Sequence, residues 1–166
     1  MSKLIRNGQL ADDTWKILRL GQGETARDVK LPVGKVLVPP AVWHARRAEL
    51  IHREYEHGWE LGIWLAADEP PSSIERDIED FSVIAIEFDR FSDGSSYLAA
   101  RLLRERYGYG GELRAIGDVP NGKLSWLYRL GFDTISVPAA SRRFAGTLVR
   151  SHEPGWNDSA LAVAAA

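Results

Sequence analysis

Cysteine is absent from the sequence. A chain without cysteine forms no disulfide, no thiolate zinc site, no cysteine-ligated iron–sulfur cluster and no covalent c-type haem attachment. Redox chemistry would therefore require a non-covalent flavin or haem, and no motif in the sequence calls for either. We expect the protein to bind no cofactor and to be colourless.

Long hydrophobic runs are also absent. No apolar stretch is as long as a membrane helix, which needs about 18 residues. The N-terminal stretch MSKLIRNGQLADD lacks the apolar core of a secretory signal. The formal net charge of -2 gives no electrostatic reason to expect a nucleic-acid partner. These features predict a cytoplasmic protein with neither a membrane nor a nucleic acid as partner.

Apolar runs alternate with amphipathic segments from about Val36 onward. Strands are expected at residues 35–39, 59–67, 82–88, 111–118 and 133–138. Helices are expected at residues 41–58, 71–81, 93–108, 122–131 and 141–150. About five βα units with short loops predict an α/β domain with a mainly parallel sheet, right-handed crossovers and helices on both faces. A flavodoxin-like sandwich is the first expectation, and a half-barrel that needs a second copy is the alternative.

The domain organisation follows from the same pattern. The alternation of apolar and amphipathic segments begins only at about Val36, so residues 1–35 are predicted to form an N-terminal extended arm or small strand pair. This segment is attached to a single α/β domain over residues 36–150. Residues 151–166 end in SALAVAAA, which is typical of a flexible tail.

Polar residues gather directly after two of the predicted strands. Ligands in parallel α/β folds lie beyond the carboxyl ends of the strands. The stretch FDRFSDGSS follows one strand and GDVPNG the next, so we expect their side chains to share one crevice. The ligand-binding candidates are Glu87, Asp89, Arg90, Asp93, Gly94, Ser95, Ser96, Asp118 and Asn121. Arg142 and Arg143 follow the last strand.

Two kinds of ligand fit these candidates. The backbone N–H groups of residues 94–96, together with Arg90, suit an anion; however, Asp93 serves equally well as the cap of the next helix. Oxygen atoms of Glu87, Asp89 and Asp118 suit magnesium, but acids in such loops are usually solvated or paired with arginines. We therefore predict a metal-free protein.

Catalytic residues stay unassigned. No serine lies in a nucleophile elbow, and chain order supports no Ser–His–Asp arrangement. His44, His52 and His57 spread around the axis of their predicted helix, which disfavours a metal site there. The sequence leaves open whether the protein is an enzyme.

Several blocks together resemble a bacterial family, domain of unknown function 934. They are VPPAVWHARRAEL, LGIWLAADEPP, VIAIEFDRFSDG, YLAARLLRERYGYGGELRAIGDV and LGFDTISV. The resemblance spans about Val36 to Val137. The chain departs from the family pattern at Ser95 and Ser96 and at residues 120–122, all within the predicted crevice.

The resemblance implies a role in assimilatory sulfite or nitrite reduction, because the family is labelled an oxidoreductase of that process. Since the chain lacks cysteine, we expect an accessory protein that binds a reductase component or a small anionic ligand, and that forms a homo-oligomer. The alternative is a small enzyme acting on an anionic or phosphorylated substrate at the strand-end crevice.

Overall fold

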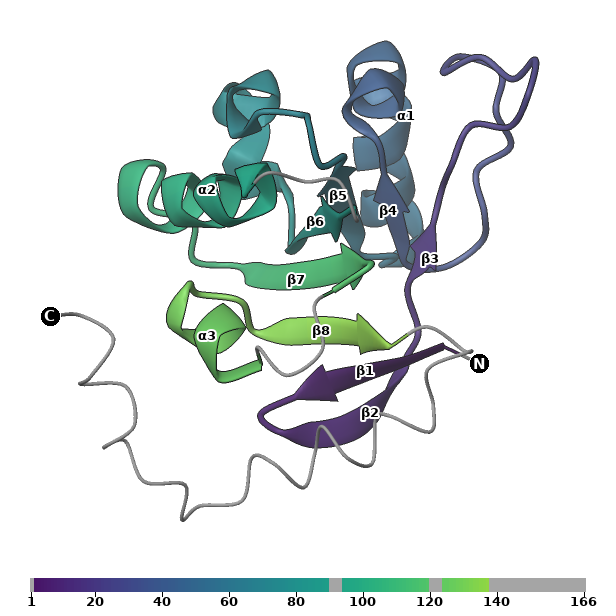
Figure 1. The fold of residues 1–166 in the computed structure, drawn as a ribbon. Helices are drawn as coiled ribbons and strands as arrows, with labels where there is room; N and C mark the ends of the chain where they lie inside the picture. Colours follow the sequence, from purple (N-terminus) through teal and green to yellow (C-terminus); the bar gives the residue numbers. More distant parts are fainter. Residues whose placement is uncertain (1, 90–93, 120–123, 138–166) are drawn as a thin grey trace, which may run out of the picture.

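A computed structural model describes residues 2–89, 94–119 and 124–137 of the chain. Strands within these ranges form one eight-stranded sheet in the order β2-β1-β8-β7-β6-β5-β4-β3 (Figure 1). The strands are β1 Ser2–Arg6, β2 Gln9–Asp13, β3 Lys16–Ile17, β4 Val36–Val38, β5 Leu61–Leu65, β6 Val83–Phe88, β7 Glu112–Gly117 and β8 Thr134–Val137. Strands β3 to β8 pair in parallel, while β1 pairs antiparallel with both β8 and β2.

The helical segments lie between the parallel strands. They are α1 Pro40–His57, the 3-10 helix η1 Pro71–Asp80, α2 Ser95–Arg101 with its π-helical continuation η2 Leu102–Arg106, and α3 Leu124–Arg129. The helix predicted at 71–81 is the 3-10 helix η1, which begins after Pro70 without a side-chain cap. Helix α1 ends at Gly58 as predicted. The helix predicted at 141–150 lies outside the described residues.

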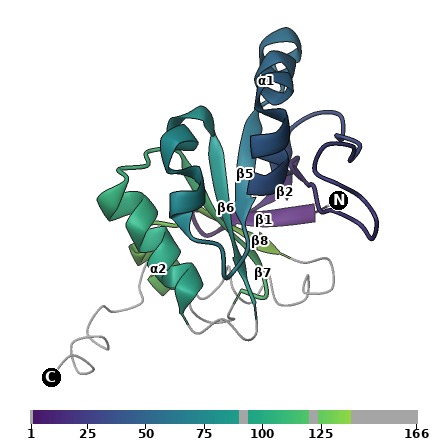
Figure 2. The same ribbon diagram turned by 90° about the horizontal axis from the view of Figure 1, so that it is seen from above.

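All of these helices cover the same face of the sheet. From β4 to β8 the strands follow one another in space in chain order, so each right-handed crossover moves in the same direction and returns to the same face. One apolar cluster accordingly unites alternate strand residues with residues of α1, η1, α2 and α3. The predicted flavodoxin-like sandwich with helices on both faces was therefore wrong. The molecule is an α/β half-barrel, the alternative prediction (Figures 1 and 2).

The first 35 residues do not form a separate arm. Strands β1 and β2 make a hairpin whose two-residue turn, Asn7-Gly8, has positive φ at both positions, as a type I′ turn requires. β1 joins the sheet at β8, and β3 joins it at β4. The β character was predicted, but the segment contributes strands to both ends of the sheet.

The sheet is strongly curled. β2 and β3 form its two edges, yet two residues, Thr14 and Trp15, connect them. Edges of a flat eight-stranded sheet would lie ~34 Å apart, whereas the steps from Asp13 to Lys16 span at most about 11 Å. Curling therefore brings the edges together, and the connection crosses the face opposite to the helices, here called the interior face.

The interior face has its own apolar cluster. It consists of Trp15, Leu37, Trp64, Val83, Ala85 and Ile116, with Ala66 packed against it. Trp15 lies so close to Gly62 that a Cβ there would be 3.1 Å from its ring and 2.7 Å from the Val83 carbonyl oxygen. The absence of a side chain at position 62 thus allows the Trp15 indole to pack against β5 on the interior face.

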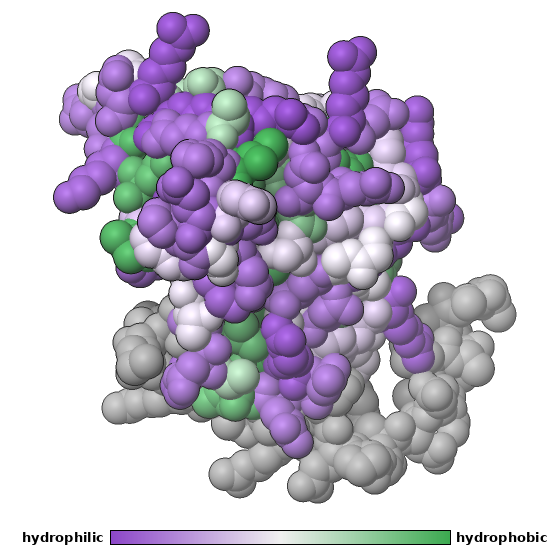
Figure 3. All heavy atoms as spheres, turned by 180° about the vertical axis from the view of Figure 1, so that it is seen from behind, coloured by the Kyte–Doolittle hydropathy of each residue, from purple (hydrophilic) through white to green (hydrophobic). Residues whose placement is uncertain are grey.

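The outer surface is mostly hydrophilic, with separate hydrophobic patches when seen from behind (Figure 3). Among the described residues, no helix combines the length and the apolar character needed to cross a membrane.

Candidate functional site

The loops after β6 and β7 begin side by side. Phe88 and Gly117 are partners in the parallel ladder, and the Asp118 N–H donates a 2.8 Å hydrogen bond to the Phe88 carbonyl. Asp89 and Asp118 therefore follow adjacent strand ends, and both are exposed. This neighbourhood, with the nearby ends of β3 and β5, is called the carboxyl edge below.

An ion pair spans the interior face at the carboxyl edge. Arg19, which follows β3, places its Nη2 2.5 Å from Oε1 of Glu87 on β6. The Arg19 side chain is 50% exposed and that of Glu87 23%. Of the predicted candidates, Glu87 is thus engaged by a residue that lies 68 positions away.

Trp64 supports this ion pair. The Arg19 guanidinium carbon lies 4.5 Å from the centroid of the Trp64 ring, a cation–π distance. The indole N–H of Trp64 donates to the Leu18 carbonyl at 2.9 Å, so the residue before Arg19 is held against the same ring. Trp64 is 9% exposed and thus combines a place in the apolar interior with contacts to Leu18 and Arg19 at the carboxyl edge.

Gly117 makes room for Glu87. Its φ is +81°, a conformation that L side chains rarely adopt, and a Cβ would lie 2.5 Å from the Phe88 carbonyl oxygen and 3.1 Å from Cγ of Glu87. The absence of a side chain at position 117 therefore leaves space next to β7 for the Glu87 side chain.

Ser95 and Ser96, whose backbone N–H groups were the predicted anion donors, use their hydroxyl groups within the fold. Ser95 Oγ donates to the Ala67 carbonyl at 2.6 Å, and Ser96 Oγ donates to the Glu87 carbonyl at 2.8 Å. Gly94 precedes α2 in the left-handed region. These contacts fix the start of α2 against the ends of β5 and β6. Arg90, Asp93, Asn121, Arg142 and Arg143 lie outside the described residues.

The magnesium alternative has no geometric support in the part of the chain that the structure describes. Within it, no group of three or more His, Asp or Glu side chains is arranged to hold a metal ion. Glu87, one of the three proposed ligands, instead pairs with Arg19.

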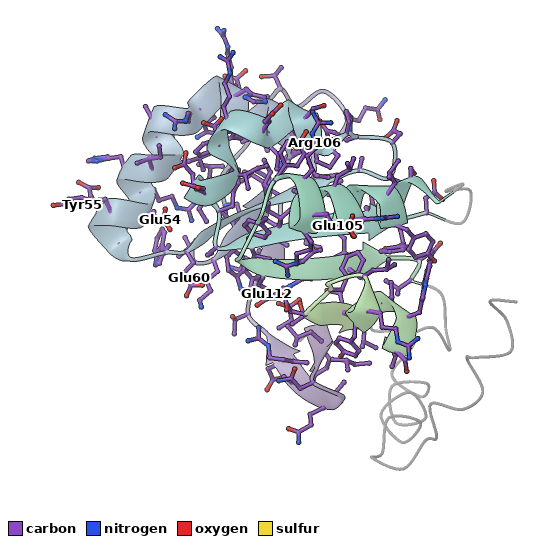
Figure 4. The ribbon with its side chains drawn as sticks, turned by 90° about the vertical axis from the view of Figure 1, so that its left-hand side faces the viewer. Glu54, Tyr55, Glu60, Glu105, Arg106 and Glu112 are labelled. Atoms are coloured by element: carbon purple, nitrogen blue, oxygen red, sulfur yellow. The ribbon has the colours of Figure 1, made fainter. Side chains whose placement is uncertain are left out.

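A second set of charges lies deeper on the interior face. Arg114 on β7 is 1% exposed; its Nη1 donates to Asp13 at 2.8 Å, and its Nη2 donates to Glu112 at 2.7 Å. Glu112 also accepts a 2.7 Å hydrogen bond from the Thr134 hydroxyl and pairs with Arg6 at 2.5 Å. We call these five residues the buried ion-pair cluster. Figure 4 shows Glu112 where β7 approaches the N-terminal hairpin.

The buried ion-pair cluster perturbs the acid–base behaviour of Glu112. Burial acts to raise the pKa of this carboxyl, but the positive charge of Arg114 and the hydrogen bonds from Thr134 and Arg114 outweigh it. The net result is a pKa below the ordinary 4.5, so the carboxylate form is favoured. The cluster thus ties the β2–β3 connection to β7 and β8 through charge-assisted hydrogen bonds.

Sequence reasoning missed Arg19 and Arg114. For Arg114 a signal existed, because a charged residue stands inside the apolar strand ELRAIG, and such a residue must find partners when buried. No local pattern marks Arg19, since its partners Trp64 and Glu87 are distant in sequence.

Comparison with known proteins identifies a family. The family model described as "Bacterial protein of unknown function (DUF934)" matches residues 62–151, more than half of the chain. The match begins at the second residue of β5 and extends past β8, so it contains Trp64, Glu87, Asp89, Gly117 and Asp118 of the carboxyl edge. Neither the curated proteins nor the solved structures contain a match. The chain belongs to the DUF934 family of bacterial proteins, as the sequence resemblance predicted.

Proposed function

We propose that this protein is a cytoplasmic accessory protein of assimilatory sulfite or nitrite reduction that acts by binding a small ligand with an anionic group or a reductase component. The pathway rests on the resemblance of the sequence blocks described above. The observation that carries the binding role is the half-exposed Arg19 guanidinium, held on Trp64 at the carboxyl edge. Binding sites of parallel α/β folds lie at this edge.

An accessory role suits the chemistry of the chain better than electron transfer. With no cysteine, the protein has no thiol to oxidise and no thiolate ligand for an iron–sulfur cluster. Binding and presenting a ligand, or docking on a reductase, requires neither.

A reductase or a second copy would meet a surface on α1. Tyr55 is 89% exposed and Ile51 39%, and Figure 4 shows Tyr55 directed away from the molecule at the end of α1. The N-terminal segment was also expected to contribute to this contact. Of its apolar residues, Leu4, Ile5, Trp15 and Leu18 are buried within the same molecule, whereas Ile17 is 37% exposed. We therefore expect α1 to supply most of the oligomer or reductase contact.

The second candidate function is an enzyme acting on a small anionic or phosphorylated substrate at the carboxyl edge. The location of Glu87, Asp89 and Asp118 favours it, because carboxyl groups at the ends of adjacent strands supply acid–base groups where parallel α/β enzymes carry out their chemistry.

Deletion of the gene tests the proposal. Growth on sulfate or sulfite as sole sulfur source should be impaired, and cysteine should restore it. Complementation with Arg19→Gln tests the carboxyl edge, complementation with Tyr55→Glu tests the α1 surface, and Gly110→Ala is a control because a Cβ there meets open space. Normal growth of the deletion strain on sulfate, with no reductase co-purifying, would contradict the accessory role and favour the enzyme.

A further inference from the structure

We infer that the Arg19–Glu87 pair recognises a zwitterionic small molecule, in which an oxyanion binds Arg19 and an ammonium group binds Glu87. The inference rests on the site of the proposed function and narrows its ligand to one chemical class: amino acids and aminosulfonates.

Both charged side chains of the pair are accessible to solvent at the carboxyl edge, since Arg19 is 50% exposed and Glu87 23%. Glu87 accepts a hydrogen bond from Nη2 of Arg19, and a guanidinium carries five N–H donors in one plane. Contact with Trp64 restrains the position of the guanidinium, whose central carbon is 4.5 Å from the ring centroid. With half of the Arg19 side chain exposed, a carboxylate or sulfonate can approach its outer edge in a bidentate manner.

Fold stability alone does not account for the construction around this pair. Half-exposed ion pairs contribute little to stability. Nevertheless, the Trp64 indole is anchored to the Leu18 carbonyl beneath Arg19, and a glycine at position 117 leaves the space beside Cγ of Glu87 open. Backbone, aromatic ring and missing Cβ together keep the two charged groups in place at the edge where ligands bind.

Electrostatics select a zwitterion over a simple anion. The charges of Arg19 and Glu87 cancel, because the two groups are 2.5 Å apart. An anion alone would meet the Arg19 cation but also the adjacent Glu87 carboxylate, and like charges at short range repel. A ligand that brings an ammonium group to Glu87 removes this repulsion while its oxyanion occupies Arg19.

Titration of the full-length protein with matched probes tests the inference. Taurine and β-alanine carry both groups, ethanesulfonate and propionate carry the anion alone, and ethylamine carries the cation alone. We expect saturable binding of at least one zwitterion by calorimetry or NMR, and binding at least about tenfold weaker for its single-charge analogues, as expected when one charged hydrogen bond is lost.

Variants locate the binding. Arg19→Gln and Glu87→Gln should each weaken zwitterion binding by about tenfold or more, and Arg19→Lys should weaken it by less because the charge remains. Arg101→Gln is the matched control, because Arg101 pairs with Glu105 at 2.8 Å on an exposed helix surface. Circular dichroism and thermal melting verify that each variant is folded.

Three results would overturn the inference: no zwitterion binds, ethanesulfonate binds as tightly as taurine, or binding survives Arg19→Gln and Glu87→Gln. These outcomes are separable from the fate of the proposed function. Zwitterion binding by a protein whose deletion leaves growth on sulfate normal would retain the ligand class and reject the pathway. A growth defect of the deletion strain, combined with no zwitterion binding by the protein, would retain the pathway and reject the ligand class.

Discussion

Two arginine–carboxylate arrangements on the interior face differ in one physical variable, their access to water. Arg114 in the buried ion-pair cluster is 1% exposed and has two carboxylate partners, whereas Arg19 at the carboxyl edge is 50% exposed and has one. A buried guanidinium with satisfied donors has no capacity for a ligand and its loss is costly to the fold. An exposed one contributes little to stability and can bind another anion. The same residue type therefore holds the sheet together at one place and is available for recognition at the other.

The largest effect should follow removal of the buried charge. Arg114→Met leaves the Asp13 and Glu112 carboxylates without their shared partner, and breaking a buried ion pair costs about 3–5 kcal/mol. Urea denaturation should show this loss in the free energy of unfolding. A triple variant, Arg114→Met with Asp13→Asn and Glu112→Gln, should recover part of it. An unchanged midpoint in Arg114→Met would show that the cluster does not stabilise the curled sheet.

A smaller loss is expected from Gly62→Ala. The added Cβ would lie 2.5 Å from Leu37 Cδ2 and 2.7 Å from the Val83 carbonyl oxygen, and the backbone atom cannot easily move away. Overpacking of this kind costs about 1–3 kcal/mol. Gly110→Ala, where a Cβ has no neighbour within 4 Å, is the control in the same thermal melts. Equal melting temperatures for the two variants would argue against close packing of Trp15 on β5.

The stability that the buried ion-pair cluster provides should be lost at acid pH and retained at neutral pH. The pKa of Glu112 is lower in the folded protein than its ordinary 4.5. A carboxyl with a depressed folded pKa contributes stability that is present above its unfolded pKa and is lost as the pH falls through the folded pKa. The free energy of unfolding should therefore decline below about pH 4.5. Glu112→Gln should be less stable than the natural chain at pH 7 and should show a shallower decline; identical slopes would contradict the assignment.

The smallest stability effect is expected at the carboxyl edge. Arg19→Ala removes a half-exposed ion pair, so the free energy of unfolding should change by no more than about 1 kcal/mol, similar to Arg101→Ala on the helix surface. Zwitterion binding should be lost in the first variant and kept in the second. A loss of several kcal/mol in Arg19→Ala, as predicted for Arg114→Met, would abolish the distinction between the two regions.

Local patterns predicted the parallel half of the fold well. The run SVIAIEF predicted a strand at 82–88, and β6 spans Val83–Phe88; WELGIWLAA predicted one at 59–67, and β5 spans Leu61–Leu65. A strand pair was one of the two structures predicted for residues 1–35, but its turn was not located, although Asn7-Gly8 is a strong turn signal. The side of the sheet that helices cover could not be predicted from these runs. A strand buried on both faces has the same apolar pattern whether its second face meets helices or the interior of a curled sheet.

The location of three candidate residues, Glu87, Asp89 and Asp118, was predicted, because the strand ends of a parallel sheet share one edge. The register pairs Phe88 with Gly117, so Asp89 and Asp118 follow adjacent strand ends. Their role in ligand binding stays a prediction. Arg19 was not identified from the sequence. It follows β3, an edge strand of two residues without a distinctive pattern, and it reaches Glu87 across the sheet.

The sequence by itself determined the chemistry that this protein lacks and the order of its local elements. Missing cysteines exclude thiol-based sites whatever the fold, and hydrophobic periodicity sets strands and helices because it depends on neighbours along the chain. Curling of the sheet decided the rest. It brings Asp13 to Arg114, 101 residues away, and Arg19 to Glu87, 68 residues away. Contacts at such separations depend on strand order and curvature, which arise from the packing of the whole domain and leave no trace in any short segment.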